Sequence, residues 1–397
     1  MTLIEHFQAL DHFIRQHEGL WRPRPFTFLE LPWEKQHPAM AGWLRRRTLE
    51  EAEKEHNDPF AIPAPSPFPE LADTARRLSK VAALPTTVFS PASATRLCVD
   101  IPGRKWQQIQ AFSGCLQFSQ PPRHWLDWCA GKGHLGRLLA SNGTPSTCLE
   151  WKAELVESGH LLSQRLGIQL NHLQQDVLAD DIAERFQPEH TPIALHACGD
   201  LHVRLIQAAI THGCRQLALA PCCYNRIQGT NYQPLSHAGR ASSLQLDQDD
   251  LRLPLSETIT AGNRVRRQRD RSMAWRLGFD LLQRRLRQQD SYLPTPSLPS
   301  DWLHKPFEQY CRDLAALKNL SQPVSENWQA LEQHGWQRLA QVRNLELVRT
   351  LFRRPLELWL LLDQALLLQE HGYTVRLGTF CSHALTPRNL MLLAERN

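Results

Sequence analysis

Between residues 122 and 227 short apolar runs alternate with amphipathic segments, and this alternation restricts the fold more than any other feature of the chain. Five runs have the length of strands: 124–129, 146–150, 168–176, 192–198 and 215–223. The segments between them, such as 153–166, carry apolar residues at helical spacing. Strands that alternate with helices form a parallel sheet covered by helices on both faces. We therefore predict an α/β fold with a doubly wound sheet.

The end of the chain predicts how this sheet is completed. An apolar helix is expected at 352–371, followed by strands at 372–380 and 389–395. A connection this short joins only antiparallel strands, because a parallel crossover needs about a dozen residues or more. Residues 351–397 are thus expected to add a helix and an antiparallel hairpin to the core formed by residues 86–227.

Two further regions lack the alternation. Residues 1–85 are helical segments separated by proline-rich breaks, which indicates an N-terminal helical module. Residues 228–350 carry helical patterns and few strand-like runs, so we expect a mainly helical insertion after the fifth strand.

The first predicted strand leads into a glycine-rich turn, DWCAGKGHLG at 127–136. Gly131 and Gly133 let the backbone approach a ligand closely, and the following helix presents its N-terminus there. A G-x-G-x-x-G turn in this setting is shared by dinucleotide-binding domains and, more loosely, by enzymes that bind S-adenosylmethionine. The same motif also occurs in turns that bind no ligand and serve only the packing of the helix. The turn alone therefore does not identify a cofactor.

Three acidic residues near the carboxyl ends of the first three predicted strands separate these cofactors. Asp127 suits the cationic amino acid part of S-adenosylmethionine, whereas it would repel a pyrophosphate. Glu150 is placed to accept hydrogen bonds from both ribose hydroxyls, and Asp176 from the adenine amino group. We therefore predict S-adenosylmethionine as the cofactor, held by these acids together with Gly131 and Gly133.

Four short strings resemble a known family. DWCAGKGHLG, LHACGDL, PCCYN and LTPRNL are similar to the methyltransferase-like-25 family and to the methyltransferase portion of glutathione S-transferase C-terminal domain-containing protein. The resemblance covers about 122–227 and 352–397. It implies a Rossmann-like class I methyltransferase sheet, with its antiparallel C-terminal hairpin, and S-adenosylmethionine as cofactor. Residues 1–85 do not resemble a glutathione transferase domain, so no thiol-transfer role is implied.

The fourth and fifth predicted strands end in LHACGDL and PCCYN, and their carboxyl ends line one crevice. We expect His196 beside the cofactor and assign candidate catalytic roles to Asp200, Cys222 and Tyr224. Asp200 is either a base or the cap of the following helix. Tyr224 and Asn225 are candidates for holding an acceptor amine, although the N/D-P-P-Y/F/W motif of many amino-methylating enzymes is missing after strand 4.

The cysteines of this crevice have three interpretations. Cys222, which follows Pro221, is a candidate nucleophile for attack on a pyrimidine, provided that a neighbouring cation or helix N-terminus lowers its pKa, and His196 is a candidate helper. A metal site built from His196, Cys198, Cys222 and Cys223 is disfavoured, because adjacent residues of a strand point to opposite faces. We therefore assign no metal. The simplest interpretation makes Cys129, Cys198 and Cys222 small buried fillers.

A basic segment lies in the predicted insertion. Residues 264–287 hold nine arginines and two aspartates, a net charge of +7 against +5 for the whole chain. Arginine suits phosphate contacts and the nearby Trp275 suits base stacking, so RNA is the candidate partner, with Arg264, Arg266 and Arg267 as contacts. A solvated helix face with arginines paired to acids has the same composition.

These observations predict an S-adenosylmethionine-dependent methyltransferase acting on RNA or protein. The alternative is a non-catalytic methyltransferase-like module that binds RNA or a partner protein. The charged N-terminus lacks the apolar core of a signal peptide, and the longest apolar run, at 356–368, is interrupted by Asp363. Ten sparse cysteines suit reduced thiols. We therefore expect a cytoplasmic protein without a membrane anchor, and no feature predicts its oligomeric state.

Overall fold

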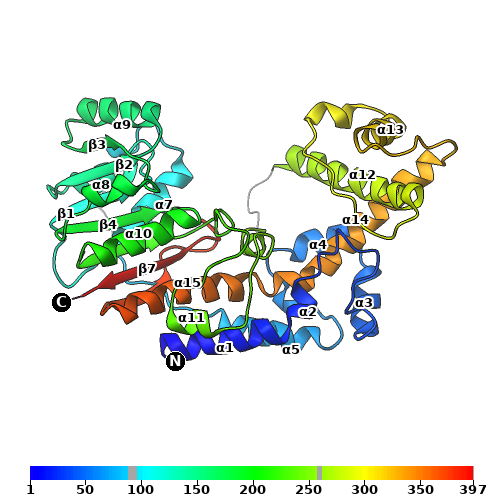
Figure 1. The fold of residues 1–397 in the computed structure, drawn as a ribbon, viewed down its shortest axis with the longest axis horizontal. Coiled ribbons are helices and arrows are strands. Elements are labelled where there is room, and N and C mark those ends of the chain that lie inside the picture. The colour runs from blue at the N-terminus through cyan, green and yellow to red at the C-terminus, as the bar shows by residue number, and fades with distance from the viewer. Residues whose placement is uncertain (88–95, 257–261, 397) are drawn as a thin grey trace. The chain divides into compact units, whose positions relative to one another are not determined.

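The computed structural model describes residues 1–87, 96–256 and 262–396, and the chain divides into two compact units (Figure 1). The first, here called the sheet unit, comprises Met1–Phe13, Leu78–Ser256 and Pro355–Asn397. The second, the helical unit, comprises Ile14–Arg77 and Glu257–Arg354. The helical unit thus takes residues from both the predicted N-terminal module and the predicted insertion.

The sheet unit is built on seven strands in the order β3-β2-β1-β4-β5-β7-β6. The first five strands are parallel to their neighbours, and β7 pairs antiparallel with both β5 and β6. This confirms the predicted doubly wound sheet with an antiparallel C-terminal hairpin. The strands are β1 (His124–Trp128), β2 (Ser146–Glu150), β3 (Asn171–Gln174), β4 (His190–Leu195), β5 (Gln216–Ala220), β6 (Thr374–Thr379) and β7 (Leu390–Glu395).

Helices pack on this sheet because their apolar side chains and those of the strands are buried against each other. Helix α8 packs on β1 and β2, α9 on β2 and β3, and α10 on β4 and β5. Phe112, Leu138, Ile193 and Leu393 are among the residues of the core. The helices of this unit are α1 (Leu3–Gln16), which belongs to it as far as Phe13, α7 (Gly103–Gly114), α8 (His134–Ala140), α9 (Ala153–Leu166), α10 (Asp200–Thr211), α11 (His237–Ala241), α15 (Arg353–Glu370), which belongs to it from Pro355, and the 3-10 helices η2 (Asp180–Arg185) and η3 (Asp250–Leu255).

The segment after β5 is anchored to α15 by one carboxylate. Asp363 is fully buried and accepts hydrogen bonds from the Tyr232 hydroxyl at 2.8 Å and from the Leu235 backbone N–H at 2.7 Å. It also accepts from the backbone N–H and hydroxyl of Ser236. A buried carboxylate is costly unless its oxygens are hydrogen-bonded in this way. Asp363, which interrupts the longest apolar run, therefore holds the chain where it leaves the sheet.

The helical unit consists of helices joined by irregular segments. Helix α12 packs on α14, and α13 contacts both. Among the described residues, no helix has the length and the apolar character that crossing a membrane requires. The helices of this unit are α2 (Glu18–Trp21), α3 (Pro38–Arg45), α4 (Leu49–Glu55), η1 (Pro59–Ala61), α5 (Phe68–Leu78), α12 (Asn263–Arg287), η4 (Ser300–His304), α13 (Phe307–Leu317) and α14 (Trp328–Thr350).

Candidate active site

The glycine-rich turn joins β1 to α8 with three residues in the left-handed region. Cys129, Gly131 and Gly133 have φ angles of 57°, 58° and 70°. A Cβ at Gly133 would lie 2.6 Å from the ring of His172, so only glycine fits there. A Cβ at Gly131 would have no atom within 4 Å, so the turn presents open space at this residue. The turn is therefore tight against the sheet on one side and accessible on the other.

Asp127 lies beneath this turn and not on its surface. The residue is 2 % exposed, and its Oδ2 accepts a 2.9 Å hydrogen bond from the backbone N–H of Gly136 in α8. The thiol of Cys148 donates to the same oxygen at 3.7 Å. Burial raises the pKa of Asp127 to about 7, although the Gly136 bond and Arg137 counteract this. Gly136 itself packs closely on Cys148, which accounts for the third glycine of the motif.

Glu150 ends β2 and is bonded directly to the turn. Its Oε2 accepts from the backbone N–H of Gly131 at 2.9 Å, and its Oε1 accepts from that of Lys152 at 3.0 Å. Each carboxylate oxygen has a second lone pair, so both remain able to accept another hydrogen bond. Asp176 is exposed two residues beyond β3 and accepts from the backbone N–H of Leu178.

The three predicted acids act together on one thiol. Burial raises the pKa of Cys129 to about 12, and Glu150, Asp127 and Asp176 add to this rise through their negative charges. Glu150 is bonded to the turn at Gly131, Asp127 is bonded to Gly136 at the start of α8, and the charge of Asp176 also reaches Cys129. Their summed field favours a cation there and disfavours a phosphate. The cofactor roles of these residues remain predictions.

His196 follows β4 and has a φ angle of 68°. Its side chain is held by helix α7, for which the sequence predicted no role in the site. Its Nε2 is 2.8 Å from Oε1 of Gln108, a residue of α7. Burial, together with the positive charges of Lys105 and Arg388, lowers the pKa of His196 to about 4. The imidazole is therefore neutral at pH 7 and does not supply the cation that a Cys222 nucleophile would need. The only sequence signal for α7 is an amphipathic helix placed before the alternation begins.

Asp200 is the first residue of α10, whose N-cap is Gly199, so Asp200 is not the cap of this helix. Its Oδ2 accepts from the backbone N–H of Gln228 at 2.7 Å, and its own N–H donates to the Arg226 carbonyl at 3.1 Å. The segments that follow β4 and β5 are thereby fastened to each other. The proposed role of Asp200 as a base remains a prediction.

The residues after β5 differ from one another in exposure and in pKa. Tyr224 is 3 % exposed and its ring meets His202 edge-on, with the centroids 5.6 Å apart, so it does not present a face to an acceptor here. Hydrogen bonding to Cys198 and Cys223, together with burial, raises the pKa of Cys222. The bond from Cys222, aided by Arg226 and Arg388, lowers the pKa of Cys223 to about 5. The lowered pKa that a Cys222 nucleophile would require is therefore found at Cys223 and Cys198, and the pKa of Cys222 moves in the opposite direction.

The basic segment forms α12, and most of its arginines have partners within the helical unit. Arg269 pairs with Glu53, Arg284 with Asp280, and Arg285 with Glu326. Trp275 is 4 % exposed and its indole donates to Glu332, so the expected base stacking on this ring is wrong: the ring belongs to a hydrophobic core. Arg264, Arg266 and Arg267, near the start of α12, are exposed.

Comparison with known proteins supports the chemistry of the sheet unit. Residues 104–230 match a family model described as a methyltransferase domain. The match contains the turn, the three acids and the segments after β4 and β5. No curated protein sequence matches the chain.

Solved structures with limited similarity include several methyltransferases. Magnesium protoporphyrin IX methyltransferase from Synechocystis PCC 6803, with bound S-adenosylhomocysteine, is 13 % identical over 77 % of this chain and 94 % of that chain, with a TM-score of 0.31. The 16S rRNA methylase RmtB is 18 % identical over 47 % and 78 %, with a TM-score of 0.21.

A third similar structure is described by its reaction, conversion of a disulfide bond into a thioacetal group during echinomycin biosynthesis. It is 19 % identical over 35 % of this chain and has a TM-score of 0.22. The present chain spans about half of its length, 51 %. The strand order, and not these alignments, carries the fold assignment.

Proposed function

We propose that this chain is an S-adenosylmethionine-dependent methyltransferase whose acceptor is RNA or a protein. The observation that carries the proposal is that Glu150 and Asp127 are hydrogen-bonded to the glycine turn and the helix after it, with Asp176 at the next strand end. The methyltransferase-domain match over residues 104–230 and the resemblance to the methyltransferase-like-25 family point the same way. The charges of Glu150 and Asp176, and that of Asp127 when it is ionised, suit a ligand with a cationic sulfonium and a cationic amine, and they oppose a dinucleotide.

The residues present fit such a cofactor. The open space at Gly131 lies on the same turn that Glu150 bonds, so a ribose there would meet the free lone pairs of that carboxylate. Asp176 is exposed on the neighbouring strand end and is available to an adenine amino group. Asp127 acts from below through its charge, which a bound cation would stabilise in the ionised form.

Each side chain then has a limited chemical task. The cofactor, when bound, supplies an electrophilic methyl group on a sulfonium sulfur. Glu150 and Asp176 bind and orient that cofactor, and Asp127 adds its charge from below. The neutral His196, fixed by Gln108, offers a ring nitrogen without adding a positive charge beside it. Asp200 holds the segments after β4 and β5 together, where an acceptor would enter.

Cofactor choice is the direct test. Calorimetry with the purified chain should detect binding of S-adenosylmethionine and S-adenosylhomocysteine, and no heat from NAD at the same concentration. If neither sulfur compound binds, the proposal is wrong. If they bind but no methyl group is transferred to fractionated cellular RNA or protein, the non-catalytic module becomes the better account.

RNA is the acceptor favoured by the charge on α12. Arg264, Arg266 and Arg267 lie within its first five residues, and its first turn contains no acidic residue. All three side chains are exposed, and they add three positive charges to one end of the helix. Exposed arginines grouped in this way are suited to a polyanion.

Salt dependence tests this part of the proposal. Binding of a mixed-sequence single-stranded RNA should weaken as salt rises, and neutralising the three residues to glutamine should reduce the log–log slope by about 2, since each phosphate contact contributes about 0.7. Fluorescence anisotropy measures both. The control, Arg76, Arg77 and Lys80 changed to glutamine, removes the same charge from exposed sites and should keep the slope. A flat salt response in the unaltered chain would exclude RNA.

A further inference from the structure

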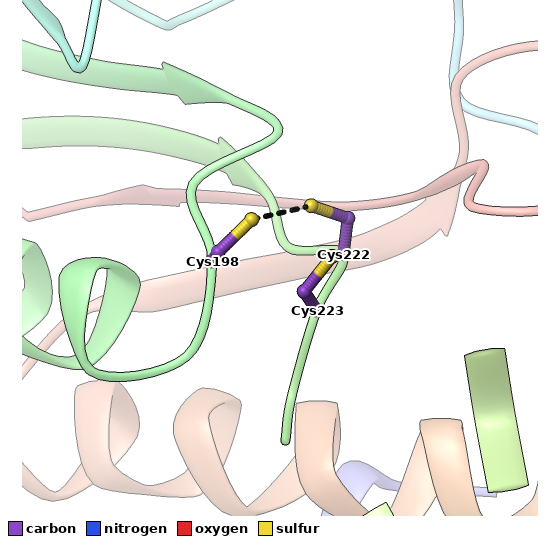
Figure 2. A group of neighbouring side chains, drawn as sticks. All are labelled: Cys198, Cys222 and Cys223. Carbon is purple, nitrogen blue, oxygen red and sulfur yellow. Dashed lines mark hydrogen bonds between the residues drawn. The ribbon is translucent and has the colours of Figure 1, made fainter. Parts of the chain in front are cut away.

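Three cysteines from two strand ends meet beside the candidate active site. Cys198 follows β4, and Cys222 and Cys223 follow β5. The sulfur atoms of Cys198 and Cys222 are 3.3 Å apart and face each other, with Cys223 next to them (Figure 2). All three sulfur atoms lie within 4.8 Å of one another. They therefore form one group, here called the thiol cluster.

The backbone explains why these side chains converge. The backbone N–H of His196 donates a hydrogen bond to the carbonyl of Ala220, which keeps the segments after β4 and β5 together. Gly199 lies so close to Arg226 that a Cβ would be 1.8 Å from its carbonyl oxygen. Cys222 and Cys223 come after the end of β5, so the alternation of a strand does not apply to them. The sequence argument against a metal here assumed that both lay on the strand.

We propose that the thiol cluster binds one Zn²⁺ ion through Cys198, Cys222 and Cys223. Zinc is held by thiolate sulfur at about 2.3 Å in tetrahedral sites, which places ligand sulfurs about 3.8 Å apart. The distance of 3.3 Å and the limit of 4.8 Å lie on either side of that value. Each sulfur–sulfur separation would therefore have to change by about 1 Å or less to reach it. Thiolates are soft ligands, which excludes Mg²⁺ and Ca²⁺ as the preferred ions.

The charge around the cluster suits a metal thiolate. Three thiolates and one Zn²⁺ carry a net charge of −1, and binding releases the thiol protons to solvent. Arg226 lies in the same turn as Cys223, since its backbone N–H donates to the Cys223 carbonyl at 3.2 Å. Its positive charge is therefore close to the remaining negative charge.

The number of protein ligands predicts the kind of zinc site. Structural zinc sites have four protein ligands, whereas catalytic sites keep one position for water or substrate. Among the described residues, the group of potential ligands here contains three cysteines and no fourth side chain. Cys198 and Cys223 are only partly buried, so the fourth position is accessible to water or to a donor atom of an acceptor. The proposal does not depend on the methyltransferase function.

Metal titration tests it on the whole chain. The reduced protein, freed of metal by a chelator, should bind one Zn²⁺ in competition with a chromophoric chelator. Co²⁺ in the same site should give the sulfur-to-cobalt charge-transfer absorption of thiolate ligands. Cys198→Ser, Cys222→Ser and Cys223→Ser should each weaken zinc binding at least tenfold, about 1.4 kcal/mol. The control Cys381→Ser removes a partly buried thiol outside the cluster and should bind zinc like the unaltered chain.

Several outcomes overturn the proposal. One is that the reduced, unaltered chain does not bind zinc. Another is that zinc affinity is unchanged in all three cluster variants. The third is a Cys198–Cys222 disulfide that resists treatment with a thiol reductant. Thermal unfolding shows whether any variant fails to fold. In that case the test is the cobalt spectrum of the unaltered chain, and absence of the sulfur-to-cobalt absorption would overturn the proposal. Binding of S-adenosylhomocysteine, measured on the same samples, reports on the proposed function separately.

Discussion

Gly199→Ala is expected to destabilise the sheet unit by roughly 3–5 kcal/mol, a large part of the 5–15 kcal/mol that holds a domain folded. Gly199 has φ 53° and ψ −126°, a conformation that costs other residues about 1–3 kcal/mol. Its Cβ would also lie 1.8 Å from the carbonyl oxygen of Arg226, and a backbone atom cannot rotate away. The segments after β4 and β5 would have to separate. Urea unfolding followed by circular dichroism measures the loss.

Gly143→Ala separates strain from overlap. Gly143 also has a positive φ, 87°, but a Cβ there would meet no atom within 4 Å. It should cost only the strain, about 1–2 kcal/mol. Equal losses in the two variants would contradict the predicted overlap. If the Gly199 variant does not accumulate as soluble protein while the Gly143 variant does, the loss of stability at Gly199 is larger than predicted and the overlap is supported.

Glu150→Gln is expected to lower the affinity for S-adenosylhomocysteine by roughly 10- to 100-fold. Hydrogen bonds to a charged group are worth about 1.5–3 kcal/mol, and the substitution removes the charge from the proposed ribose acceptor. In the unaltered chain, the two carboxylate oxygens of Glu150 accept hydrogen bonds from the backbone N–H groups of Gly131 and Lys152. The amide of glutamine has only one oxygen, so its NH₂ group would face one of these two N–H donors and that hydrogen bond would be lost. The turn would lose one of its fixed positions. Calorimetry measures the change in affinity.

The matched control is Glu157→Gln, which removes the same charge from an exposed position on α9. Its affinity should equal that of the unaltered chain. Unchanged affinity in the Glu150 variant would show that this residue does not contact the cofactor. A thermal unfolding curve for each variant separates weaker binding from a damaged fold.

The sheet was predictable because local pattern and burial agree there. The predicted β2 and α9 coincide with Ser146–Glu150 and Ala153–Leu166, where apolar spacing is regular. The third strand is shorter than expected, Asn171–Gln174, because it lies at the edge of the sheet and has little to bury. Edge strands carry a weaker hydrophobic pattern than central ones.

The contents of the site were less predictable, since they depend on contacts between distant segments. Sequence placed Asp127 at a strand end, but its burial comes from α8 folding back over it. The hydrogen bond between His196 and Gln108 joins residues 88 positions apart. Likewise Trp275 sits among arginines in sequence, and its burial depends on α13 and α14. Side-chain partners of this kind have no local pattern.

The strand order also has a consequence for synthesis of the chain on the ribosome. β5 ends at Ala220, but its neighbour β7 begins only at Leu390, roughly 170 residues later. At about 5–20 residues per second, the exposed hydrogen-bonding edge of β5 waits roughly 10–30 s for its partner. An unpaired apolar edge is a template for aggregation. The nascent chain is therefore expected to need a chaperone, or shielding by its own intervening helices, until its last strand emerges.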